Sequence, residues 1–136
     1  NARVQVTIDG LGANTNKNYL PESGDLWDTV NNKIIMEAIW DSYDVRLDWK
    51  AKASTNNAYY DVQLDIGDGS PIVIVQTTQA MVKGINVEQR FSKTISGFAL
   101  STFITNWGKL FFDSTGDAVN MSIYDLAIYI KRQYNT

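Results

Sequence analysis

Two stretches of the chain decide its fold: YDVRLDWK at residues 43–50 and YDVQLDI at residues 60–66. In each stretch every second residue is apolar, and the residues between are polar or charged. Because side chains along a β-strand alternate between two faces, each stretch builds one apolar and one polar face. The segment between them, residues 53–57, is short and mostly polar, as in a hairpin connection. We therefore predict that the two stretches pair as a hairpin at the centre of an antiparallel sheet with one buried face.

The rest of the chain also favours strands separated by turns. Alternation at Val4, Val6 and Ile8 predicts a first strand, and a last strand is expected from about Met121 to Ile130. Residues 72–75 are all β-branched, which predicts a strand buried on both sides. Residues 25–40 are ambiguous. Apolar residues four apart permit a helix, but two asparagines interrupt it, and we favour two short extended pieces.

About eight strands with turn clusters between them predict an all-β fold, an antiparallel β-sandwich in a single domain. Residues 11–23 have the composition of a loop, rich in Gly, Asn, Thr and Pro. We therefore divide the chain into an N-terminal strand and loop, a candidate anchoring arm, at residues 1–24, and a head domain at residues 25–136.

The composition excludes several kinds of chemistry. The 136 residues include no Cys and no His, so disulfides, thiolate nucleophiles and His-dependent triads are impossible. The net charge is −3 and the 12 basic residues are scattered, which argues against a nucleic-acid partner. No apolar run approaches the roughly 18 residues of a membrane span, so we expect no membrane insertion, and no signal peptide is visible.

The 15 carboxylates are the only acid–base groups that could form a catalytic or metal site. Asp44, Asp48, Asp61 and Asp65 lie on the polar faces of the two decisive stretches, where we expect them to be solvated. The turn at residues 65–70 superficially resembles a Ca²⁺ loop but lacks the downstream Glu. We therefore expect no catalytic residues, no metal and no cofactor.

The aromatic residues are the remaining candidates for binding. Trp107 stands in a predicted turn between Asn106 and Gly108, and it is our candidate for stacking on a sugar ring. Its alternative role is to fill the core or an interface, as we expect for Tyr43 and Trp49.

Four stretches, in their order along the chain, carry a resemblance to a known family. They are NKII at 32–35 before DSYDV at 41–45, RFSKTI at 90–95 with residues 98–104, NWGKLF at 106–111, and IYDLAIYIKR at 123–132. Together they resemble the jelly-roll head shared by tumour necrosis factor, the globular heads of complement and many virus and bacteriophage surface proteins. The resemblance implies a jelly-roll β-sandwich, usually trimeric, with no shared catalytic residues.

The Cys-free composition, rich in Asn, Thr and Gln, looks more like a bacteriophage virion component than an animal ligand. We therefore expect a non-enzymatic protein of the virion surface, a head-decoration or fibre-knob module that forms a homotrimer and contacts other virion proteins. Interface candidates are Phe112, Tyr124, Leu126 and Tyr129. The alternative is a carbohydrate- or receptor-binding module of a tail fibre that recognises a host surface glycan. A carboxylate-based glycosidase is a third hypothesis, which the spacing of the acidic residues does not require.

Overall fold

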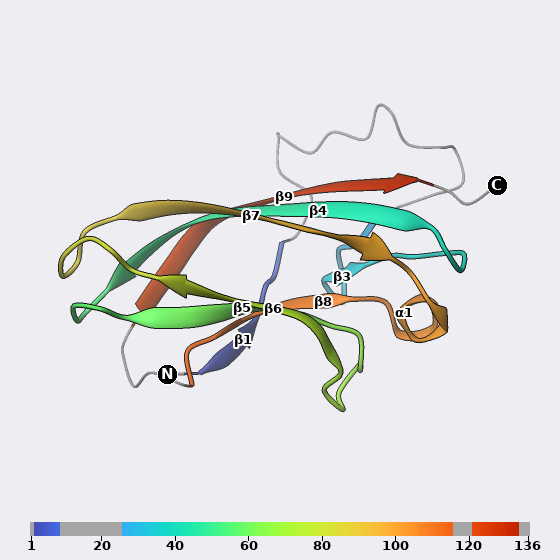
Figure 1. Ribbon diagram of the computed structural model, residues 1–136, viewed down its shortest axis with the longest axis horizontal. Helices are drawn as coiled ribbons and strands as arrows, with labels where there is room; N and C mark the ends of the chain where they lie inside the picture. The colour runs from blue at the N-terminus through green and yellow to red at the C-terminus, as the bar shows by residue number, and fades with distance from the viewer. Residues whose placement is uncertain (1, 9–25, 116–120, 134–136) are drawn as a thin grey trace.

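The computed structural model describes residues 2–8, 26–115 and 121–133, and within these it is almost entirely β-structure (Figure 1). The single described helix is α1, Ser101–Asn106. The strands are β1 Arg3–Gln5, β2 Trp27–Asp28, β3 Lys33–Ile34, β4 Ser42–Ala53, β5 Tyr59–Asp65, β6 Val73–Ala80, β7 Gln89–Phe98, β8 Lys109–Asp113 and β9 Met121–Gln133. The all-β fold predicted from the alternation is therefore confirmed.

Two antiparallel sheets face each other across one core (Figure 1). The first sheet has the strand order β1-β8-β5-β6, and the second has the order β7-β4-β9. A separate pair, β2 and β3, joins the first sheet through a bridge between Ile34 and Gly108. From β4 onward the chain changes sheet at every connection except the β5–β6 hairpin. The molecule is thus a β-sandwich in which strands adjacent in the sequence mostly lie in opposite layers.

The predicted central hairpin is wrong, although the predicted faces are right. Strand β4 pairs with β7 and β9, whereas β5 pairs with β6 and β8, so the two decisive stretches lie in different sheets. Their apolar faces meet across the core: the Trp49 indole N–H donates to the Tyr60 hydroxyl at 2.7 Å. The apolar face of a strand is buried against the facing layer whichever strand lies beside it, so alternation alone does not show which strands pair.

The core is built from alternate residues of β4 and β5. Those on β4 are Tyr43, Val45, Leu47, Trp49, Ala51 and Ala53, and those on β5 are Tyr60, Val62 and Leu64. Phe91 and Phe112 pack on Trp49, with ring centroids 5.7 and 5.2 Å away. Burying these side chains supplies the main favourable free energy of folding, at about 25 cal/mol per Å² of apolar surface.

Several segments refine the predictions outside the core. Residues 25–40 hold the two short extended pieces that we favoured, β2 and β3, and Asn32 between them adopts a left-handed backbone with φ 55°. The first strand also forms, and β1 pairs with β8 at the edge of the larger sheet. The rest of the proposed anchoring arm, residue 1 and residues 9–24, lies outside the described residues.

Two further segments differ from the predictions. Residues 72–75 are not buried on both sides: Ile72, Val73 and Ile74 are 46%, 37% and 43% exposed, because β6 is an edge strand with a neighbour on one side. The resemblance also implies a strand over residues 98–104, but residues 101–106 form the short helix α1. The helix closes one end of the sandwich and buries Phe103, whose ring lies 5.2 Å from that of Tyr43 (Figure 1).

Candidate functional site

An irregularity in β9 brings two of the predicted interface residues to one face of the molecule. The pairing of β9 with β4 shifts by one residue between Asp48 and Lys50, and Asp125 opposite this shift has φ 52°. Such a bulge inserts one extra residue and exchanges the two faces of the strand beyond it. Tyr124 and Tyr129, which strict alternation would place on opposite faces, therefore both point away from the core.

A second aromatic pair lies at the end of the same sheet face. The rings of Trp40 and Phe98 meet edge to face with centroids 6.1 Å apart, and the residues are 57% and 62% exposed. The backbone holds this pair in place, because the Trp40 N–H donates to the Ala99 carbonyl at 2.8 Å and the Ala99 N–H donates to the Asp41 carbonyl at 2.9 Å. Trp40 itself has φ 73°, an unfavourable backbone for a bulky residue.

We call the outward surface of β7-β4-β9 with Trp40, Phe98, Tyr124 and Tyr129 the aromatic face. Two ion pairs on this face, Arg46–Asp48 and Lys50–Asp125, are formed within the chain. Arg46 forms an ion pair with Asp48 at 2.9 Å and lies over the Tyr129 ring at 4.2 Å, and its hydrogen bond to Asp48 raises the Arg46 pKa. A partner that covers these groups would bury ion pairs that already have their counter-charges.

The far end of the aromatic face is organised around Tyr124. Its hydroxyl donates to the Glu88 carboxylate at 2.7 Å. Partial burial and this hydrogen bond raise the pKa of Tyr124 to about 12, and the same hydrogen bond lowers the pKa of Glu88. Lys50 and Asp125 form a second ion pair beside it at 2.9 Å. The tyrosine is therefore neutral at physiological pH and fixed in orientation.

The other two predicted interface residues lie elsewhere. Phe112 is a core residue, 7% exposed, because its position in β8 faces Trp49 across the sandwich. Leu126 follows the bulge and packs against the same core. Both line a groove of about 420 Å³ between β1 and β9, where Val4 and Met121 also contribute. Neither residue lies on the face that carries Tyr124 and Tyr129.

Trp107, the predicted stacking residue, is half-buried at the end of α1. It has φ 59°, and its N–H donates to the Phe103 carbonyl at 2.7 Å, so it terminates the helix. The tight turn predicted at this position is the end of that helix. Trp40 exposes more of its surface and is the better placed tryptophan for contact with a ligand or partner.

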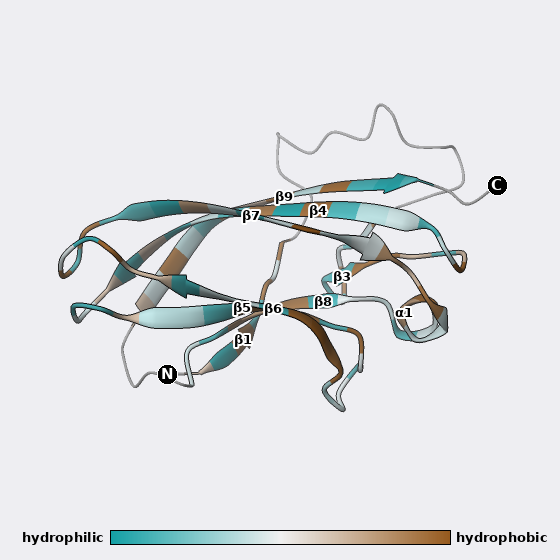
Figure 2. Cartoon of the chain, viewed as in Figure 1, coloured by the Kyte–Doolittle hydropathy of each residue, from teal (hydrophilic) through white to brown (hydrophobic). Residues whose placement is uncertain are grey.

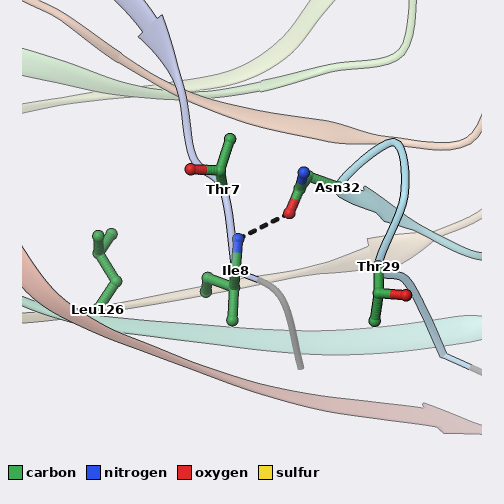
Figure 3. Close-up of a pocket in the computed structure, with 5 residues that line it drawn as sticks. All are labelled: Thr7, Ile8, Thr29, Asn32 and Leu126. Carbon is green, nitrogen blue, oxygen red and sulfur yellow. Dashed lines mark hydrogen bonds between the residues drawn. The ribbon is translucent and has the colours of Figure 1, made fainter. Parts of the chain in front are cut away.

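A shallow hollow of about 470 Å³ lies beside β9 and the β2–β3 turn (Figure 3). It is lined by Thr7, Ile8, Thr29, Asn32 and Leu126. The Asn32 side-chain oxygen already accepts the Ile8 N–H at 2.7 Å, which fixes the turn to the first strand. Among the described residues, the polar side chains that line the hollow carry two hydroxyls and an amide.

The four carboxylates of the decisive stretches do not come together. Asp44 and Asp48 lie on the outer face of one sheet, and Asp61 and Asp65 lie on the outer face of the other. Asp65 is buried and ion-paired with Arg3 at 2.6 Å, while its second oxygen accepts the N–H groups of Gly67 and Ile72. The turn at 65–70 is therefore organised by its own aspartate. Within residues 2–8, 26–115 and 121–133, no group of three carboxylates is arranged to hold a metal ion.

Sequence reasoning missed Trp40 and Phe98, although a signal was available. Both occupy positions on the polar side of the alternating pattern. Trp40 stands two residues before Ser42 and four before Asp44, and Phe98 follows Thr94 and Ser96. A large aromatic residue at a position where the pattern requires a polar one marks a surface with a purpose beyond solvation.

No family model, curated protein or solved structure compared with this chain matches it. In the part of the chain that the structure describes, no helix has the length and apolarity to cross a membrane.

Proposed function

We propose that this chain is a non-enzymatic structural module of a bacteriophage virion surface, a head-decoration or fibre-knob protein that acts as a homotrimer attached to other virion proteins. We also propose that its head domain is a jelly roll, which the strand order supports. A jelly roll needs two antiparallel sheets joined by connections that cross between them, and the chain from β4 to β9 makes such crossings at all but one connection.

The aromatic face is the observation that carries the proposal. Three of its side chains, those of Trp40, Phe98 and Tyr129, are more than half exposed. They lie on the outward face of one sheet, which also carries two ion pairs formed within the chain. Exposed aromatic residues that are fixed in place and surrounded by polar groups are typical of protein–protein contacts.

The size of this surface fits a reversible assembly. A buried aromatic side chain covers about 150–250 Å², so covering the exposed half of three of them removes about 300 Å² per chain from water. At about 25 cal/mol per Å² this contributes about 7.5 kcal/mol per chain, which roughly offsets the cost of association. We therefore expect a weak trimer that forms at high micromolar concentration and is strengthened when many copies are held on one particle.

Sedimentation velocity of the wild type and three variants tests the proposal. Phe98→Ser and Tyr129→Ser each remove about 100 Å² of apolar contact, and we expect each to weaken the trimer by well over tenfold. The control is Val82→Ser, which removes an apolar side chain that is 84% exposed in the β6–β7 connection and leaves the trimer unchanged. A wild type that stays monomeric at high micromolar concentration, or a trimer that both aromatic variants leave intact, would overturn the proposal.

The exposed Trp40 ring supports a second candidate function, receptor or glycan binding by a tail-fibre module. An exposed indole beside polar groups can stack on a sugar ring. Titration of the wild type and of Trp40→Ala with host surface glycans distinguishes the two functions. Saturable binding that the substitution abolishes, with the trimer preserved, would favour the tail-fibre function over the assembly function for this residue.

A further inference from the structure

Strand β6 has an outer edge that pairs with no described strand and whose Ala80 carbonyl accepts a weak hydrogen bond from the Gln79 side chain, at 3.2 Å. It is the last strand of the sheet β1-β8-β5-β6, and among the described residues β5 is its only strand partner. The Met81 N–H donates to the Ala58 carbonyl at 2.8 Å. Because hydrogen-bonded and non-hydrogen-bonded pairs alternate along an antiparallel ladder, the backbone groups of Gln76, Thr78 and Ala80 point away from β5.

The usual protections of an edge strand are weak on β6. Natural edge strands are guarded by charges, bulges or short length, but no charged residue occurs between Asp68 and Lys83. The start of the strand is apolar and exposed at Ile72, Val73 and Ile74, seen as the brown end of the β6 ribbon (Figure 2). Within the described part of the chain, the features that disfavour pairing at this edge are a bulge opposite Asp65 and a proline at position 71.

The other described edges are better protected. β1 has three residues, β7 carries Arg90 and Lys93, and β9 carries Lys131 and Arg132 together with the bulge at Asp125. The open edge is therefore a property of β6 and not of the sandwich as a whole.

We propose that β6 pairs antiparallel with β6 of a second copy of this chain and joins the two larger sheets into one. Two identical edges related by a twofold axis satisfy each other's outward N–H and C=O groups. Because the strand is uncharged, two copies meet without like-charge repulsion, whereas the charged edges of β7 and β9 would oppose self-pairing. A second copy is also the partner present wherever the protein is concentrated.

The pattern of outward groups selects the register. Centring the axis on Thr77 makes Gln76 and Thr78 of opposite copies a hydrogen-bonded pair and places Ile74 against Ala80. It also places the two Thr77 residues opposite each other as a non-hydrogen-bonded pair, with Cα atoms about 4.5 Å apart. Threonine pairs across such positions are favourable.

This contact is independent of the aromatic face, which lies on the other sheet. The contact involves the edge of one strand of eight residues. The area buried on such an edge is far less than the roughly 800 Å² per partner of a standard interface. The contact therefore acts as a weak link between copies that another contact or a high concentration brings together.

Single cysteines test the pairing directly, since the chain contains no other thiol. A disulfide needs Cα atoms about 4.4–6.8 Å apart, so only residues on or beside the twofold axis can join to themselves. Under mild oxidation at high micromolar concentration we expect Thr77→Cys to form disulfide-linked dimers at least about tenfold faster than Thr102→Cys, an exposed position on α1. Gln76→Cys and Thr78→Cys cover the two neighbouring registers.

Charge variants in the Thr77→Cys background provide the matched control. Gln76→Lys puts the positive charges of the two copies two residues apart across the axis, about 8 Å from each other, and should reduce dimer formation to the rate of Thr102→Cys. Val82→Lys adds the same charge outside the strand and should leave the rate unchanged. Cross-linking of none of positions 76, 77 and 78 above the helix control would overturn the proposal. So would a β6 edge that binds an uncharged extended peptide while the chain itself does not self-pair.

Discussion

Replacing Tyr60 with Phe tests whether the two decisive stretches face each other across the core. The Trp49 indole N–H donates to the Tyr60 hydroxyl at 2.7 Å, and both side chains are almost fully buried. Removing the hydroxyl leaves a buried N–H without its acceptor, which costs about 1–3 kcal/mol. The ring of residue 60 keeps its edge-to-face contacts with Phe91 and Phe112, so little of the loss comes from packing.

The same substitution should have the opposite effect when Trp49 is Phe. In that background the Tyr60 hydroxyl is the buried group without a partner, so removing it is neutral or stabilising. Urea unfolding of the four proteins, followed by circular dichroism, gives the free energies of unfolding, with Tyr129→Phe as a surface control. If Tyr60→Phe changes the free energy of unfolding by less than about 0.5 kcal/mol and by the same amount in both backgrounds, the two side chains do not meet and the facing of β4 and β5 is wrong.

Three further predictions concern the backbone, the buried ion pair and a close contact. At the bulge, Asp125→Val should lower the stability of the fold by about 1–2 kcal/mol, because the φ of 52° at position 125 disfavours a β-branched residue. Asp125→Gly should be neutral or stabilising. Thermal unfolding compares the two variants. Burial acts to raise the Asp65 pKa, but the N–H groups of Gly67 and Ile72 together with Arg3 hold it below 3.8. The resulting stabilisation is present above about pH 4 and is lost as pH falls through the folded-state pKa. Asp65→Asn should therefore flatten the dependence of the free energy of unfolding on pH below pH 4. An unchanged dependence would contradict this. A Cβ at Gly97 would lie 2.8 Å from the Tyr43 hydroxyl, so Gly97→Ala should destabilise the fold by about 1–3 kcal/mol. Adding Tyr43→Phe to this variant should restore part of the loss, measured by urea unfolding. The absence of any rescue would refute that contact.

The alternation of apolar residues predicted which side chains are buried, but not which strands are neighbours. Tyr43, Val45, Leu47 and Trp49 face the core as expected, because period two is a local property of an extended chain. Strand partners depend on contacts between distant segments, and the same apolar face satisfies a hairpin and a facing sheet equally well. The polar segment 53–57 is compatible with both connections.

The alternation of apolar residues also did not predict which strand lies at the edge of a sheet or where β9 bulges. The run at 72–75 is apolar throughout, which is typical of a strand buried on both sides, yet it begins an edge strand. The bulge at Asp125 exchanges the faces of β9, so Tyr124 joins Tyr129 while Leu126 turns to the core. A single inserted residue is invisible in a strand whose two faces both contain aromatic and aliphatic residues.

Fluorine NMR of protein labelled with 5-fluorotryptophan tests the central claim most directly, because the chain has four tryptophans with different surroundings. Single Trp→Phe variants assign the resonances. We expect the Trp40 signal to shift and lose solvent exposure as concentration rises through the assembly range, while Trp49, already in the core, stays constant. If the Trp40 signal remains solvent-exposed while the mass of the oligomer increases, assembly uses another surface, and this result would contradict the account.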